Sequence, residues 1–139
     1  MIRVDVFALN KRFRRLELPV RTAAEKLIRL IRLRNCALTV YLAGKSVMNK
    51  NVLAYPAPKG FPRPDIMEVP LGEIFLNPDY IKKEKLEKLE IRNSKLEIPA
   101  KLVYMLAHGF LHLLGYNHKH DRDRIKMERK ERELLGKLR

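Results

Sequence analysis

The chain has 139 residues, of which 46% are hydrophobic, so it is long enough for one packed domain and short for two. A single cysteine, Cys36, excludes a disulfide framework and a thiolate metal site. No apolar run is long enough to span a bilayer and no secretory signal is visible, so we expect a cytoplasmic protein.

The charge of the chain is unusual. Thirty Lys and Arg against sixteen Asp and Glu leave a formal net charge of +14. Such an excess indicates a polyanionic partner, most often nucleic acid. The alternative is the solvated surface of a heat-adapted protein, but those proteins carry the two signs nearer balance.

The first third of the chain predicts two strands with a helix between them. Alternating apolar residues over 2–9 are typical of a strand. A basic segment follows, and Pro19 is expected to break the chain. Thr22 and Glu25 have the spacing of a capping box, so an amphipathic helix is expected to begin at Thr22. Residues 36–43 are apolar and β-branched, which indicates a buried strand.

The middle of the chain predicts two short strands around a loop. Residues 51–56 and 71–77 resemble strands, and the intervening stretch is rich in proline and glycine. Pro78 is suited to the first turn of a helix, whose charged residues over 78–91 would face water.

The last third predicts two helices. Pro99 opens the most apolar helix of the chain, which Gly115 is expected to terminate. The final segment from Asp121 reads as a charged helix with few packing residues. These are Ile125, Met127, Leu134 and Leu135. Strands interleaved with helices predict a single α/β (α+β) domain over residues 1–139, with a sheet of about four strands.

Three of the four histidines stand within eleven residues, in "HGFLHLLGYNH". His108 and His112 are four apart, so a helix places them on one face. Gly115 permits a sharp turn, after which His118 can reach the same point. Three neutral imidazole nitrogens suit one Zn²⁺ ion and leave its fourth position open, as in catalytic sites. His120 is the rival third ligand, and imidazole also suits iron, nickel and copper.

The histidine pair partly matches a metalloprotease signature in which a Glu follows the first histidine as general base. Gly109 stands there instead, and glycine has no proton acceptor. This departure, together with the net charge, disfavours a peptidase.

The same residues resemble the H-G-x-L-H-L-x-G-Y-D-H signature of the YbeY family of metal-dependent endoribonucleases, which act in ribosomal RNA maturation. "NVLAYP" (51–56) and "LGEI" (71–74) are similar to two strands of that family, and Met127 and Glu131 fit its closing helix. The resemblance implies a small α/β domain with a mixed four-stranded sheet, and a zinc ion held by His108, His112 and His118.

The chain departs from the family pattern in three places. Asn117 replaces the family's Asp before the third histidine, and a shortened segment before Asn51 has no match for a characteristic arginine. The third departure is a proline-rich loop, where Lys59 and Arg63 are candidate substitutes for the missing charge.

We therefore expect a zinc-dependent endoribonuclease of single-stranded type that acts in ribosomal RNA maturation. In this hypothesis zinc activates water or a ribose hydroxyl for attack on a phosphodiester, and Lys50 or Arg63 holds the phosphate. The expected partner is ribosomal RNA or a ribosomal particle. Six cations are predicted to follow the RNA backbone: Lys11, Arg12, Arg14, Arg15, Arg29 and Arg32. Phe13, among them, is expected to pack in the core rather than stack on a base.

Two alternatives remain. The first is a catalytically weakened RNA- or ribosome-binding protein that keeps the metal. The second is a metal-dependent hydrolase that acts on another substrate.

Overall fold

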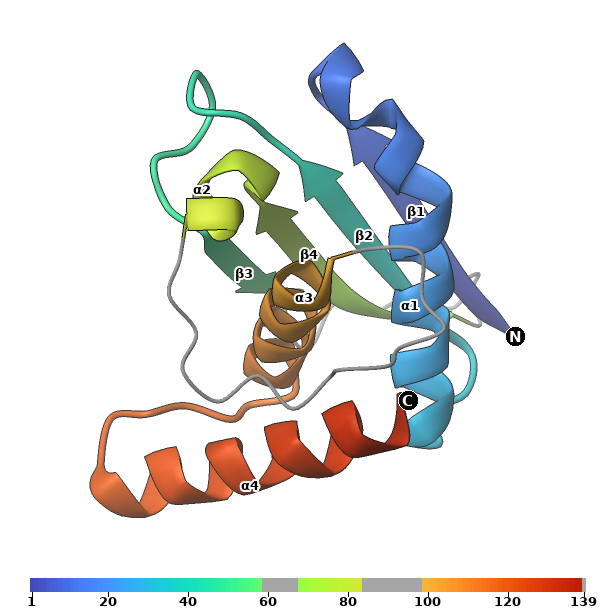
Figure 1. Cartoon of the computed structure of the whole chain (residues 1–139). Coiled ribbons are helices and arrows are strands. Elements are labelled where there is room, and N and C mark those ends of the chain that lie inside the picture. Colours follow the sequence, from blue (N-terminus) through green and yellow to red (C-terminus); the bar gives the residue numbers. More distant parts are fainter. Residues whose placement is uncertain (59–67, 84–98, 139) are drawn as a thin grey trace.

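Four strands form one mixed sheet in the order β1-β2-β4-β3 (Figure 1). β1 (Ile2–Ala8), β2 (Cys36–Leu42) and β4 (Val69–Leu76) are parallel, and β3 (Val52–Pro56) pairs antiparallel with β4 at the edge. The parallel β1–β2 pair requires a crossover, which a helix supplies. The α/β class and the mixed sheet of four strands are confirmed.

Helices cover one face of this sheet (Figure 1). A short 3₁₀ helix, η1 (Lys11–Leu16), leads into α1 (Glu17–Leu30), which packs against β1. α3 (Ala100–Leu113) packs against β3 and β4, while α4 (Asp121–Lys137) lies across α3 and α1. The short α2 (Pro78–Lys83) contacts α3. Alternate residues of β2 are buried, as expected for a strand with one face against helices.

The computed structural model describes residues 1–58, 68–83 and 99–138. Most of the proline-rich loop, including Lys59 and Arg63, lies outside the described residues, as does the predicted helix beyond Lys83. None of the described helices is both long and apolar enough to cross a membrane.

The predicted start of the first helix is wrong. α1 begins at Glu17, so Pro19 and Thr22 both lie inside it. Proline is tolerated there because the N–H groups of a first turn have no partner within the helix. The Thr22 hydroxyl donates to the Leu18 carbonyl, 3.0 Å away, instead of capping.

The packing stripe of α4 was also predicted with one error. Ile125 is 47% exposed, whereas Met127, Glu131, Leu134 and Leu135 are buried. The buried residues recur at intervals of three and four, which defines one helix face, and Ile125 is out of phase with that face. Glu131 therefore occupies one position of an otherwise apolar buried face.

Candidate metal centre

α3 ends in a turn that reverses the chain. The Tyr116 N–H donates to the Leu111 carbonyl and the Gly115 N–H donates to the His112 carbonyl, both at 3.1 Å. These two bonds define a Schellman motif, which needs a residue with positive φ; Gly115 has φ 100°. The expected role of this glycine is confirmed, and the turn carries His118 back beside the helix.

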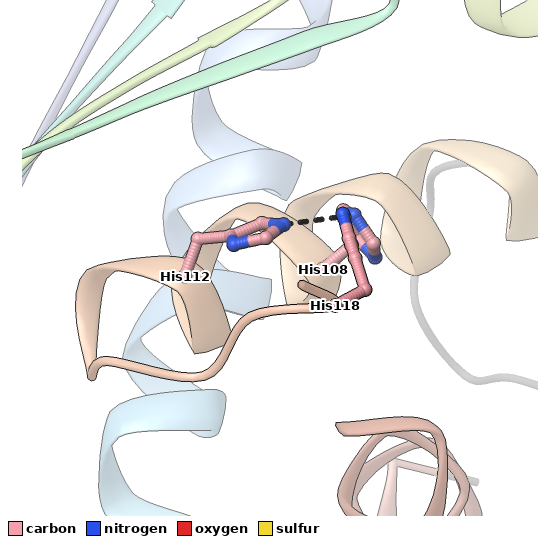
Figure 2. Close-up of side chains that lie close together, drawn as sticks. All are labelled: His108, His112 and His118. Atoms are coloured by element: carbon pink, nitrogen blue, oxygen red, sulfur yellow. Dashed lines mark hydrogen bonds between the residues drawn. The ribbon is translucent and has the colours of Figure 1, made fainter. Parts of the chain in front are cut away.

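The three predicted histidines lie together. The nitrogen atoms that His108, His112 and His118 offer are all within 4.8 Å of one another. Figure 2 shows the first two side chains leaving α3 and the third approaching from the following loop. Their ring centroids are 4.7 to 5.5 Å apart. His120, the rival ligand, is exposed at the N-cap of α4 and does not belong to this group.

Hydrogen bonds orient two of the rings. His108 Nδ1 lies 2.6 Å from Glu131 Oε1, and His112 Nδ1 lies 3.0 Å from the Tyr116 carbonyl oxygen. A carboxylate and a carbonyl only accept, so both Nδ1 atoms are assigned the proton and donate it. Each Nε2 is then left with a lone pair in the neutral ring. Burial, followed by the neighbouring His108, lowers the pKa of His112, which favours that neutral form.

The two Nε2 atoms face each other at 3.1 Å. Two lone pairs at this separation repel unless a proton or a cation lies between them. In a tetrahedral zinc site, ligand nitrogens at 2.0–2.1 Å from the metal are about 3.3 Å apart. The spacing of the His108 and His112 nitrogens therefore fits an ion such as Zn²⁺, and the His118 nitrogen lies within 4.8 Å of them as a third donor. Other metals that accept imidazole also suit this donor set.

A buried carboxylate connects this cluster to α4. Glu131 is only 4% exposed, and its second oxygen accepts a hydrogen bond of 3.2 Å from the Tyr104 hydroxyl. Burial, and then the Glu131 carboxylate, raise the pKa of Tyr104 to about 12, so the phenol remains a donor. Such carboxylate–histidine contacts fix the tautomer and orientation of metal ligands.

The sequence pointed to Glu131 only through the family resemblance, and it did not single out Tyr104. One signal was available: Glu131 follows Met127 by four residues and precedes Leu135 by four, so it lies within an apolar stripe. A carboxylate in such a stripe needs a buried partner.

Gly109 explains how closely α3 approaches the sheet. A Cβ atom there would lie 3.1 Å from methyl groups of both Val52 on β3 and Ile74 on β4. The position thus faces the sheet rather than the histidines. The absence of a side chain lets the helix pack tightly against the two strands.

A cleft of about 810 Å³ opens beside the histidines, between β3, α3 and the loop after Gly115. This volume is in the range of ligand sites. Lys119 lines the cleft and supplies a cation that sequence reasoning missed. Asn117 also lines it, and its side-chain oxygen accepts the Lys119 N–H at 3.1 Å. An aspartate can accept the same bond, so this contact does not depend on the residue that the family usually has.

The other predicted site residues are more scattered. Lys50 is exposed just before Asn51, where the lining of the cleft begins. Arg63 lies outside the described residues. Phe13 is 4% exposed, which confirms that it packs in the core.

The six predicted RNA-binding cations are all exposed but fall into two groups. Lys11, Arg12, Arg14 and Arg15 lie on η1, whereas Arg29 and Arg32 lie at the opposite end of α1. From Glu17 to Arg29 the helix rises about 18 Å. The structure therefore does not bring the six into one patch.

Comparison with protein families matches residues 44–139 to the family described as Endoribonuclease YbeY. The chain belongs to the YbeY family. A protein from Xanthomonas campestris pv. campestris (strain B100) that carries this name is 32% identical over 133 residues, which are 94% of this chain and 73% of the relative. Its namesake from Xanthomonas euvesicatoria pv. vesicatoria is 34% identical with the same coverage. A YbeY relative from Neorickettsia sennetsu is 40% identical over 68 residues, 49% of this chain and 43% of its own.

Family membership confirms the resemblance drawn from the histidine motif. The matched region begins at residue 44 and includes β3, β4 and both C-terminal helices. The cluster, the cleft beside it and Glu131 all lie within it. The basic η1 and α1 lie before it.

Proposed function

We propose that this protein is a zinc-dependent endoribonuclease that cleaves single-stranded RNA during ribosomal RNA maturation in the cytoplasm. Its membership of an endoribonuclease family supports RNA cleavage. The observation that carries the metal dependence is the convergence of three imidazoles, two of which direct their Nε2 atoms toward each other at 3.1 Å.

In this proposal His108, His112 and His118 hold the ion. A bound divalent ion supplies a Lewis acid that activates water and neutralises negative charge on phosphoryl oxygens. The chain itself keeps the ligands in place: Glu131 orients His108, and the Tyr116 carbonyl orients His112. The third nitrogen donor comes from a loop held by the Schellman turn.

The cleft provides for the RNA. Lys119 at its wall is a cation for a phosphate group, and Lys50 beside it is a second candidate. Arg63 remains a predicted phosphate contact. Tyr104 and the apolar side chains of β3 give the cleft a wall against which a base can pack.

A histidine substitution tests this proposal. His112→Ala should lose bound metal and cleavage of single-stranded RNA, because two ligands remain, while circular dichroism should show an intact fold. His120→Ala is the matched control, since it removes an exposed imidazole from outside the cluster. The control should keep both metal content and cleavage. Equal cleavage by metal-stripped protein or by His112→Ala would refute the proposal.

The alternative of an RNA- or ribosome-binding protein without catalysis rests on two departures from the family pattern, the missing arginine and Asn117. The second departure carries less weight, because the Asn117 amide accepts a hydrogen bond from the Lys119 N–H as well as a carboxylate would. Metal-loaded protein that binds RNA but leaves it uncut would favour this alternative.

A further inference from the structure

Positive charge is unevenly distributed over the described part of the chain. On the sheet face away from the helices, Arg3 is paired with both Asp5, at 3.5 Å, and Glu68, at 3.0 Å. Glu73 adds another carboxylate to β4. This face has no excess of cations among its described residues, so the attraction for a polyanion must come from elsewhere.

A second cavity, of about 960 Å³, lies where η1, α2 and the first turn of α3 meet. Four cations from these three elements line it: Arg12, Arg15, Lys82 and Lys101. Asp79 is the one carboxylate in the lining. The floor of the cavity is apolar and includes the buried residues Phe13 and Ile81. We call this cavity the basic groove.

The contacts of these cations leave a net positive charge in the basic groove. Arg12 forms a salt bridge with Asp79 and lies over the Phe13 ring, with its guanidinium carbon 5.1 Å from the ring centroid. Lys101 donates to the Lys82 carbonyl at 3.2 Å, which leaves its charge uncompensated. For Arg15 and the Lys82 ammonium, no acidic partner occurs among residues 1–58, 68–83 and 99–138. Arg15, Lys82 and Lys101 thus bring positive charge to the basic groove without a carboxylate partner among the described residues.

The basic groove and the histidine cleft share one side of α3. Lys101 lines the groove, and seven residues later His108 lines the cleft, with Tyr104 between them. Residues seven apart are two helical turns apart on the same side, a rise of about 10.5 Å. With about 3.4 Å per stacked nucleotide, this distance corresponds to roughly three nucleotides.

We propose that the basic groove binds the sugar–phosphate backbone of the RNA substrate about three nucleotides from the bond that is cut. The inference rests on the proposed nuclease function and adds a second contact site. The groove brings together Arg12 and Arg15, two of the four predicted cations on η1, with Lys82 of α2 and Lys101 of α3. The contribution of the two lysines is evident only in the structure.

The test is RNA binding by charge-neutralised variants. A fluorescent single-stranded oligoribonucleotide is titrated with the full-length protein in EDTA, and anisotropy is recorded at several salt concentrations. The double variant Arg15→Gln, Lys82→Gln removes two phosphate contacts. For single strands each contact contributes about 0.7 to the slope of log K against log salt, so the slope should fall by about 1.4. If the two proteins bind equally at 1 M salt, that change corresponds to roughly 25-fold weaker binding at 0.1 M salt.

The matched control is Arg129→Gln, Arg132→Gln, which removes the same charge from exposed positions on α4. Its affinity should stay within twofold of the parent protein, and thermal melting should show that both double variants are folded. The inference would be overturned if both double variants weakened RNA binding equally, or if Arg15→Gln, Lys82→Gln weakened it less than threefold.

The two proposals fail in different ways. Groove-dependent binding by a protein that leaves RNA uncut when loaded with metal supports the basic groove and rejects the nuclease. If the Arg15→Gln, Lys82→Gln variant binds RNA as tightly as the parent protein and still cleaves it, the basic groove is rejected and the nuclease function is retained.

Discussion

Glu131→Gln is the most informative single change near the histidines. The amide oxygen can still accept from His108 Nδ1, and the amide nitrogen can donate to the Tyr104 hydroxyl in place of the present bond. The substitution therefore keeps the shape and the hydrogen bonds of the site and removes only a negative charge. That charge raises the basicity of the ligand and favours a bound cation.

The size of the effect follows from the burial of the carboxylate. Loss of a carboxylate behind a ligating histidine typically costs 10- to 100-fold in metal affinity. The Glu131 side chain is 5% exposed, so water screens it little and we expect the upper end of this range. A 100-fold change corresponds to about 2.7 kcal/mol.

The assay is a zinc titration in competition with a chromophoric chelator at pH 7. Glu128→Gln is the matched control, because this residue lies on the same helix, is 50% exposed and pairs with Arg124 at 3.3 Å. The control should bind zinc like the parent protein. If Glu131→Gln also binds zinc with unchanged affinity while remaining folded, the buried carboxylate does not support the site.

Three glycine positions give further predictions. Gly115→Ala should lower the free energy of unfolding by about 1–2 kcal/mol, because alanine is strained at φ 100°. The same change should weaken zinc binding by displacing His118, and unchanged zinc affinity would contradict this role of the turn. Gly72→Ala should cost about 3 kcal/mol or more, since its Cβ would lie 2.2 Å from the Tyr55 carbonyl oxygen at a residue with φ 132°. Gly136→Ala on α4, where an added Cβ would meet nothing within 4 Å beyond its own helix, should instead stabilise by about 1 kcal/mol. Urea denaturation distinguishes Gly72→Ala from Gly136→Ala, and equal unfolding midpoints for these two variants would refute the steric argument.

The elements that sequence analysis predicted well are those with a strong local pattern. β2 alternates between buried and partly buried residues, and α3 combines a long apolar face with a terminating glycine. The start of α1 was missed because Thr22 satisfies a capping pattern while its hydroxyl bonds backward to Leu18. Propensity cannot distinguish these two uses of a threonine, since both satisfy the side chain.

The convergence of the histidines follows from local sequence, because helical spacing and one glycine turn are properties of eleven consecutive residues. The surroundings of the histidines depend on the packing of the whole domain. Glu131 reaches His108 across 23 residues of chain, and Lys82 and Lys101 join Arg15 from three separate elements. Such contacts depend on how helices pack over a sheet, and packing is set by the whole core rather than by any local pattern.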